Sequence, residues 1–503
     1  MNNLQFYTPV KAQRLLKKLQ QQIDCQQISN EFIIHSFQDS FDWRLYRHNL
    51  SAEFIRSQRQ SVFILRDLSE NQIVAQTPLR ELAKFAADFD QTEAGSLLRN
   101  TIGIRALLEL CTVDYEYSVI ELYNKKHEVL ARMHFSQYEI FKNHLRIEVL
   151  KPDSRRLSKL LTWLEPEIDL TPAKHPLLHY ALKSQGRKPK DYTGKLRLEL
   201  NSEQRADQAC QQIYRELLNI IKANESGIIH RVDSEFLHDF RVAVRRTQCG
   251  LKQIGSVFPE QERTRFLDFF NWLGEISNET RDLDVHLLNF EHYKSLLDPE
   301  IRNDLNPLHN FLSLRLEQAH CQLVTILRSP EYLTALHDWD KFLKHGPDKA
   351  EVYGKKSIKH VAEKRIDKTF ERCIQQIAMV LESHKSTDYH DLRKTCKKLR
   401  YLLEFFQSLY PEDLIQTLIN SLRHCQDLLG EAQDNRVYLN HLKQYRQEMA
   451  QAGVHINTLN AIDALLNQMR QAEKSIAQRA TPVLQNFYDQ YSQHPALTPS
   501  HLC

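Results

Sequence analysis

The chain of 503 residues is poor in glycine and has no long apolar run. It contains only 12 glycines, where average usage would give roughly twice that number or more. This scarcity disfavours a turn-rich all-β fold and favours helices. No stretch approaches the ~18 apolar residues of a membrane-spanning helix, and the N-terminus, MNNLQFYTPVKAQRLLKKLQ, lacks the apolar segment of a signal peptide. We therefore expect a cytoplasmic protein with no membrane partner.

The sequence also lacks paired cysteines and the common catalytic motifs. Its nine cysteines are scattered, and none forms a C-x-x-C pair, so we expect reduced thiols that pack in cores. There is no G-x-x-x-x-G-K-[ST], G-x-S-x-G or H-E-x-x-H motif. We therefore predict no catalytic residue, no metal ligand and no cofactor.

Charge gives no global signal, because the net charge is only +3. Composition is that of a globular protein, with 42% hydrophobic and 26% charged residues. A polyanion partner would have to be recognised by a local cluster of charge.

Patterning divides the chain into two predicted domains. Residues 1–195 mix a helical segment (16–23) with alternating stretches typical of strands, at 61–68, 117–124, 128–135 and 145–151. The polar segment KSQGRKPKDYTG (183–194) reads as a linker. From 201 to 494 the period is helical throughout, with predicted helix starts at Asn201, Asp233, Pro259, Asp298, Pro330 and Pro411. We expect an α+β domain followed by an all-α domain of helical bundles.

The helical region contains an internal repeat. LHDFRVAVRRTQCGLKQIGSVFPE (237–260) aligns with YHDLRKTCKKLRYLLEFFQSLYPE (389–412) at an offset of 152, with seven of 24 positions identical. Leu273-Gly274-Glu275 is repeated as Leu429-Gly430-Glu431, at an offset four residues longer than 152. We therefore predict two copies of one helical unit, at about 201–345 and 350–494.

A helical wheel separates each repeated helix into two faces. In the second copy the apolar face predicts a buried stripe of Leu392, Cys396, Leu399, Leu402, Leu403 and Phe406; in the first copy the corresponding face carries Phe240, Val244 and Leu251. The opposite faces are basic. Arg393 and Lys397 form a like-charge pair four residues apart, and so do Arg241 and Arg245. Each such pair lowers the stability of a helix by ~0.2 to 0.5 kcal/mol.

Repeated repulsion at the same helical positions points to a bound anion. Nucleic-acid binders interleave aromatic residues with basic ones so that bases can stack, and these faces offer only Tyr401. Arginine and lysine without a stacking platform suit phosphate groups. A linear or clustered phosphate is the ligand that the pattern favours.

The segments H-D-L-R-K-x-x-K-K-L-R-Y-L-L-E-F-F, H-D-F-R-x-x-x-R-R and L-G-E-(x)5-R-D-L-D-V resemble the CHAD domain, the conserved histidine α-helical domain, over residues 201–494. The resemblance implies two pseudo-symmetric four-helix bundles whose basic helices bind inorganic polyphosphate. The contacts expected here are His238, Arg241, Arg245, Arg246, Lys252, His390, Arg393, Lys394, Lys397, Lys398, Arg400 and Tyr401. Arg281 is a further candidate contact, or a structural ion-pair partner of its acidic neighbours. Association with polyphosphate granules would follow from such binding.

The first 195 residues resemble a CYTH domain, the triphosphate tunnel metalloenzyme fold with an antiparallel sheet, through FQDSFDWRLYRHNLSAEF (37–54) and the strands after it. That family opens with E-x-E-x-K, whose carboxylates hold a catalytic metal. Here Met1, Asn3 and Gln5 occupy the motif positions if Phe6 sets the register. We therefore expect a degenerate, non-catalytic domain, with Glu148 and Lys151 either remnants of a site or an exposed strand pair.

Three alternatives remain open at this point. The chain could be a metal-dependent inorganic triphosphatase or polyphosphatase, or a module that binds nucleic acid. The repeated His-Asp dipeptide also occurs in metal-dependent phosphohydrolases, but adjacent helical residues point about 100° apart and share a metal only with further ligands.

Overall fold

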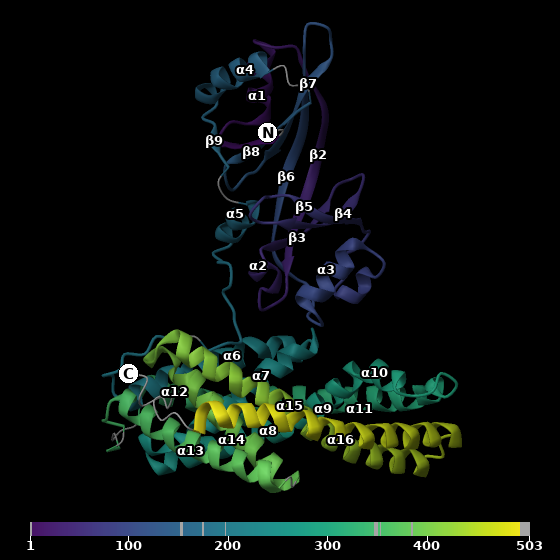
Figure 1. Ribbon diagram of the computed structural model, residues 1–503. Coiled ribbons are helices and arrows are strands. Elements are labelled where there is room, and N and C mark those ends of the chain that lie inside the picture. The colour runs from purple at the N-terminus through teal and green to yellow at the C-terminus, as the bar shows by residue number, and fades with distance from the viewer. Residues whose placement is uncertain are drawn as a thin grey trace. The chain divides into compact units, whose positions relative to one another are not determined.

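The computed structural model describes residues 3–150, 154–173, 176–196, 198–346, 351–352, 354–383 and 386–492. The chain divides into two compact units, residues 1–193 and 194–503 (Figure 1). Among the described residues, no helix combines the length and the apolar character needed to cross a membrane.

The first unit is built on an antiparallel sheet. Its nine strands within the described residues are β1 (Asn3–Thr8), β2 (Cys25–Asp39), β3 (Leu50–Arg56), β4 (Ser61–Asp67), β5 (Ile73–Pro78), β6 (Leu108–Tyr123), β7 (Val129–Gln137), β8 (Asn143–Val149) and β9 (Thr171–Pro172). Their order is β5-β4-β3-β2-β6-β7-β8-β1-β9, and every neighbouring pair is antiparallel. The predicted α+β class and antiparallel sheet are confirmed.

Strand periodicity gives this sheet one apolar and one polar face. The apolar face packs against helices: Leu15 of α1 (Ala12–Gln20) and Leu160 of α4 (Ser154–Glu167) join one core, and Leu98 of α3 (Glu93–Ile102) joins another with the 3-10 helix η1 (Ala86–Phe89). The short helices α2 (Arg44–Arg47) and α5 (Leu177–Ser184) complete the unit. The alternate side chains of the strands line a polar pocket.

The second unit is helical. Its described elements are α6 (Ala206–Ile229), α7 (Ser234–Gln253), η2 (Gly255–Val257), α8 (Glu260–Ile276), α9 (Asn278–Leu288), α10 (Phe290–Ser295), η3 (Arg302–Leu305), α11 (Asn306–Leu327), α12 (Pro330–His345), α13 (Ile358–Ser383), α14 (Ser386–Phe406), η4 (Gln407–Leu409), α15 (Glu412–Gln451) and α16 (Ile456–Ser492). The all-α prediction for this region is confirmed. Figure 1 shows α15 and α16 running side by side along the unit.

Four of the six predicted helix starts are correct to within a residue, and the start predicted at Asn201 is wrong because α6 begins at Ala206. Asp233 caps α7 through its carboxylate, and Pro259, Pro330 and Pro411 lie at the starts of α8, α12 and α15. The start at Asp298 is wrong, because α11 begins at Asn306 after the 3-10 turn η3. Pro307 follows Asn306 in the first turn of α11, where its missing N–H costs nothing.

One core cluster takes residues from both halves of the helical unit. Leu283, Leu308 and Leu312 pack with Leu442 and Ile462, which lie in α15 and α16. Helices that are far apart in sequence therefore share one hydrophobic core. This joint burial ties the two predicted repeats together.

The eight described cysteines are free thiols, and all but Cys321 are buried. The Sγ atoms of Cys373 and Cys396 lie 3.5 Å apart inside the helical unit. Cys503 lies outside the described residues. For the eight others, the prediction of reduced thiols is confirmed, with Cys321 as the exception to core packing.

Gly227 in α6 offers a test of how closely α6 and α7 pack. A Cβ atom at this position would lie 2.1 Å from the ring of Phe236. We expect Gly227→Ala to lower the free energy of unfolding by about 1–3 kcal/mol, because the ring must move out of a packed core. The measurement is chemical denaturation followed by circular dichroism.

Gly430→Ala is the matched control, since nothing lies within 4 Å of a Cβ built on this helical glycine. This variant should be neutral or stabilised by up to ~1 kcal/mol. Equal stability of the two variants would contradict the close packing of α6 on α7.

Candidate anion-binding site

The two repeated helices, α7 and α14, contact each other inside the helical unit. Their predicted apolar stripes are buried: Phe240, Val244, Leu251, Leu392, Cys396, Leu399, Leu402, Leu403 and Phe406 are all fully shielded from solvent. Burial of these stripes fixes how each helix is rotated about its axis. The basic side chains must then emerge on the other faces, where the structure separates them into three groups.

The first group anchors each basic helix to the helix that follows it. Arg241 donates to Gly274 O at 2.9 Å, to Ser277 Oγ at 2.7 Å and to Asn278 Oδ1 at 2.6 Å. These acceptors are all uncharged. Burial and the neighbouring Arg245 lower the pKa of Arg241 to about 10. Arg241 is therefore a structural anchor, and with 8% of its surface exposed it is poorly placed to contact a ligand.

Arg393 makes the equivalent contact in the second copy. Its guanidinium donates to Asp434 Oδ1 at 3.0 Å. Asp434 and Asn278 are related by the offset of 156 that also relates Gly430 to Gly274. The same basic position thus reaches equivalent positions in the two halves, which are Asn278 at the start of α9 and Asp434 within α15.

The second group surrounds a buried carboxylate. Glu404 accepts from Arg246 at 2.7 Å and lies 3.4 Å from Arg400. The two guanidinium carbons lie 5.8 Å and 5.3 Å from the ring centroid of Tyr401, within the range of cation–π attraction. Arg246 and Tyr401 are buried, and both pack beside Glu404, so their expected contact with a ligand stays a prediction.

The third group has no counter-charge in contact with it. Within the described part of the chain, neither Arg245 of α7 nor Lys397 of α14 forms a hydrogen bond or an ion pair, and Arg245 Nε is a buried donor without an acceptor. Burial, Arg393 and Arg245 lower the pKa of Lys397 from its ordinary value of 10.5 to about 8. These two cations therefore repel each other across the boundary between α7 and α14.

Of the remaining predicted contact residues, His390, Lys394 and Lys252 each have a polar partner among the described residues. His390 Nδ1 lies 3.0 Å from Gln433 Oε1, Lys394 donates to Asp391 at 3.2 Å, and Lys252 donates to Asn271 at 3.2 Å. Lys398 and Lys252 both act on the thiol of Cys249, opposing the rise in its pKa that burial causes. His238 lies half-buried near the start of α7.

Arg281 is held inside the unit rather than presented to a ligand. It donates to Ser234 O at 3.3 Å and lies 4.0 Å from Glu235. Burial lowers its pKa, and burial raises the pKa of the nearby Asp284 to about 6. Of the two roles that the sequence allows Arg281, these contacts fit the structural ion pair.

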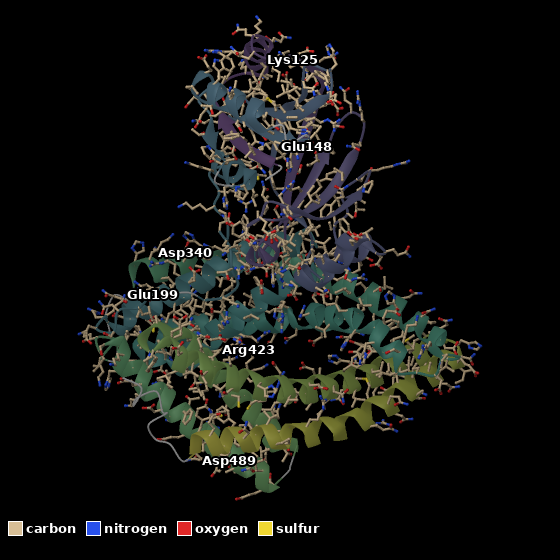
Figure 2. All side chains as sticks on the ribbon, turned by 45° about the horizontal axis from the view of Figure 1, so that its top comes forward. Lys125, Glu148, Glu199, Asp340, Arg423 and Asp489 are labelled. Atoms are coloured by element: carbon tan, nitrogen blue, oxygen red, sulfur yellow. The ribbon has the colours of Figure 1, made fainter. Side chains whose placement is uncertain are left out.

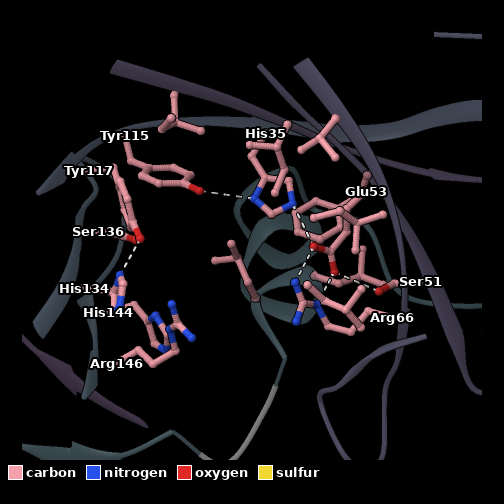
Figure 3. Close-up of a pocket in the computed structure, with 18 of the residues that line it drawn as sticks. His35, Ser51, Glu53, Arg66, Tyr115, Tyr117, His134, Ser136, His144 and Arg146 are labelled. Atoms are coloured by element: carbon pink, nitrogen blue, oxygen red, sulfur yellow. Dashed lines mark hydrogen bonds and ion pairs between the residues drawn. The ribbon is translucent and has the colours of Figure 1, made fainter. Parts of the chain in front are cut away.

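The sheet unit contains a second candidate site, a pocket of about 920 Å³ (Figure 3). Glu53 lies 3.3 Å from His35 and accepts from Arg66 at 2.8 Å and 3.0 Å. Burial alone would raise the pKa of Glu53, but the neighbouring His35 and the charge of Arg66 lower it to about 2. Sequence reasoning missed these residues, although Glu53 and Arg66 fall on alternate, same-face positions of paired strands.

Of the motif positions in the sheet unit, Gln5 can be followed in the structure. Its Oε1 lies 3.0 Å from Asn71 Nδ2 and 3.2 Å from His144 Nε2, so its side chain is occupied by neutral partners. Glu148, labelled in Figure 2, lies 3.1 Å from His134 Nε2. Met1 and Lys151 lie outside the described residues. Among the residues described, no group of three or more His, Cys, Asp or Glu side chains could hold a metal ion.

Fold and site together define a helical-bundle protein with paired basic helices, preceded by an antiparallel-sheet unit. Residues 212–443 match the family model of the CHAD domain. The expected resemblance is confirmed for these residues. No curated protein matches the chain.

Solved structures align with each unit. The crystal structure of the CHAD domain from the plant Ricinus communis has 23% identity and a TM-score of 0.49, covering 58% of this chain and 96% of its own. PptA from Streptomyces chartreusis has 12% identity and a TM-score of 0.45, and the alignment covers 56% of this chain and 100% of PptA. The putative adenylyl cyclase HpAC1 from Hippeastrum, for which a dominant triphosphatase activity is described, has 14% identity and a TM-score of 0.28, covering 38% and 100%.

Glu404 is predicted to hold the two arginines of its cluster in the folded state. Glu404→Gln should lower the free energy of unfolding by about 3 kcal/mol, because it leaves Arg246 buried without a carboxylate. Asp391→Asn, which removes an exposed partner of Lys394, is the control and should cost less than about 1 kcal/mol. Denaturant titration of both variants measures the difference, and a loss no larger for Glu404→Gln than for Asp391→Asn would contradict the structural role of this carboxylate.

Proposed function

We propose that the helical unit binds inorganic polyphosphate without catalysis, along the boundary between α7 and α14. The observation that carries the proposal is the pair of cations, Arg245 and Lys397, that face each other without a bonded counter-charge. A protein tolerates such repulsion where a ligand removes it. An anionic chain laid along both helices would accept from Arg245 and Lys397 and from the less buried Lys394 and Lys398.

The chemistry of the site favours phosphate over nucleic acid. A nucleic-acid groove needs aromatic rings on which bases can stack, and Tyr401, the one aromatic residue expected on these faces, is 5% exposed and lies against Arg246 and Arg400. Guanidinium and ammonium groups alone recognise phosphate oxygens by charge and hydrogen bonds. The CHAD domain assignment is consistent with a polyphosphate-related role.

The absence of catalysis is part of the same proposal. In the sheet unit Gln5 stands where the metalloenzyme motif has a charged residue, and it is bonded to Asn71 and His144. Metal-dependent hydrolysis of triphosphate or polyphosphate is the competing function. Phosphate release from tripolyphosphate or polyphosphate, measured with Mg²⁺ or Mn²⁺, distinguishes the two, and metal-dependent release would contradict the proposal.

Removing the repelling pair should weaken binding and strengthen the fold. Arg245→Gln/Lys397→Gln deletes two donors to the polymer, each worth about 1.5 kcal/mol or more, so polyphosphate affinity should fall at least about 100-fold. The same change relieves a buried repulsion and should raise the free energy of unfolding by about 1 kcal/mol. Calorimetric titration and chemical denaturation measure the two effects.

Lys368→Gln/Arg372→Gln is the matched control for this variant. These two cations also lie four residues apart, on the exposed surface of the neighbouring helix α13. Their removal should leave affinity within about threefold at 0.15 M salt, where exposed charges are screened. Equal losses in the two double variants would show that only the overall charge of the surface matters, against a site at α7 and α14.

Polyphosphate affinity should depend on the protonation of Lys397. Its side chain faces Arg393 and Arg400 on α14, Arg245 on α7 and Asp434 on α15. In the unliganded fold its pKa is about 8, below the unfolded value, so the unfolded chain binds the extra proton between about pH 8 and 10.5. Over that range the contribution of Lys397 to stability therefore rises with pH, while the charge available to an anion falls.

We accordingly expect affinity to decrease as pH rises from 7 to 9.5 in the natural chain. Each pH unit above the pKa lowers the charged fraction about tenfold. In Lys397→Met this part of the pH dependence should disappear. Titration calorimetry in two buffers of different ionisation enthalpy also measures proton uptake on binding, and no uptake near pH 8.5 would contradict the role of Lys397.

A further inference from the structure

The pocket of the sheet unit has a balanced charge that does not fit a metal ion with triphosphate. Its charged lining residues are two carboxylates, Glu31 and Glu53, and two guanidiniums, Arg66 and Arg146. Glu53 is paired with Arg66, and Glu31 lies 3.3 Å from Arg59. Triphosphate carries several negative charges, and a divalent cation needs clustered oxygen ligands, which the described residues do not supply. The pocket is therefore suited to a ligand of low charge.

Arg146 is the one lining cation that no carboxylate pairs with among the described residues. Arg146 lies on β8, and its charge acts on the hydroxyl of Tyr117 on β6, opposing the rise in the pKa of Tyr117 that burial causes. The Tyr117 hydroxyl donates to His134 Nδ1 at 2.6 Å, and His134 Nε2 donates to Glu148 at 3.1 Å. Figure 3 shows Tyr117, His134 and Arg146 gathered at one side of the pocket.

This chain of hydrogen bonds fixes the direction of every proton in it. Burial and the charge of Arg146 lower the pKa of His134, so the ring stays neutral and accepts from Tyr117. Glu148 orients the ring, and the ring orients the tyrosine. Arg146 lies beside this chain of hydrogen bonds, and its guanidinium has five N–H donors that can bind a ligand. A carboxylate matches the planar fork of these donors.

Aromatic side chains form much of the remaining wall. Tyr7, Tyr115 and Tyr138 line the pocket, with Ile33 and Ile64 between the polar positions. Burial raises the pKa of Tyr115 and Tyr138, so their hydroxyls stay protonated. Burial likewise lowers the pKa of His144 to about 4 and keeps it neutral. Rings of this kind pack face or edge against a flat aromatic ligand.

We propose that this pocket binds an aromatic carboxylate without a divalent cation, with the carboxylate on Arg146 and the ring against Tyr115 and Tyr138. A cavity of about 920 Å³ has the size of known small-molecule sites. The proposal concerns the sheet unit alone and does not depend on polyphosphate binding by the helical unit.

Calorimetric titration of the full chain with 2-naphthoate is the test. Three comparison probes separate the contributions: 2-naphthalenemethanol has the ring without the charge, cyclohexanecarboxylate has the charge without the aromatic ring, and tripolyphosphate with Mg²⁺ represents the metal-bound alternative. We expect 2-naphthoate to bind with a Kd of about 1 mM or tighter, and the first two comparison probes at least about tenfold more weakly.

Arg146→Gln should weaken 2-naphthoate at least about tenfold, and Arg146→Lys, which keeps the charge without the planar fork, should give an intermediate loss. Arg132→Gln is the control, since Arg132 lies on the neighbouring strand outside the pocket lining and pairs with Glu121 at 2.9 Å. A thermal scan of each variant reports whether it is folded, and an unfolded Arg146→Gln leaves Arg146→Lys to decide the test.

Two results would overturn the proposal. One is that 2-naphthoate does not bind, or binds a folded Arg146 variant as tightly as the natural chain. The other is tripolyphosphate binding with Mg²⁺ that Arg146→Gln abolishes and Arg245→Gln/Lys397→Gln leaves unchanged, because that pattern would place the metal-bound anion in the sheet unit. If polyphosphate does not bind at α7 and α14, both of these results can still be measured, so the two proposals are tested separately.

Discussion

The proposed anion site depends on an electrostatic repulsion that the fold of the helical unit does not relieve. Arg245 and Lys397 come from helices 152 residues apart in sequence, and the burial of two apolar stripes brings them together. Hydrophobic burial of that extent outweighs the cost of one like-charge contact. The fold thus holds two positive charges close together, and their electric field attracts an anion. The polyphosphate site that we propose follows from this arrangement.

The neighbouring charges are arranged so that the repulsion persists. Arg241 and Arg393 are bonded to equivalent positions of the two copies, Asn278 and Asp434. Glu404 is shared as an ion-pair partner by Arg246 and Arg400 nearby. These contacts hold α7 and α14 in position and take most of the compensating carboxylates and amides. Arg245 and Lys397, at the boundary between the two helices, are left without such a partner among the described residues. The helical wheel alone did not distinguish these two cations from the other basic residues of the same faces.

Much of the fold could be predicted from the sequence, because local patterns determine it. The alternation in 61–68, 117–124, 128–135 and 145–151 correctly predicted β4, β6, β7 and β8, and the helical wheel correctly placed the buried stripe from Leu392 to Phe406. The wheel could not separate Arg241, Arg246 and Tyr401 from Arg245 and Lys397. That distinction depends on partners such as Ser277, Glu404 and Asp434, which lie elsewhere in the sequence or on the far side of the same helix. The pocket around Glu53 and Arg146 was missed for the same reason, since five or more strands must pair before its residues meet.

The most direct measurement is a crystal structure of the full chain with a short-chain polyphosphate. We expect phosphate density along the boundary between α7 and α14, with oxygen atoms within hydrogen-bond distance of both the Arg245 guanidinium and the Lys397 ammonium. The internal bonds of Arg241 and of Glu404 should be unchanged in that complex. Density bound elsewhere on the chain, with Arg245 and Lys397 left without a phosphate contact, would contradict it.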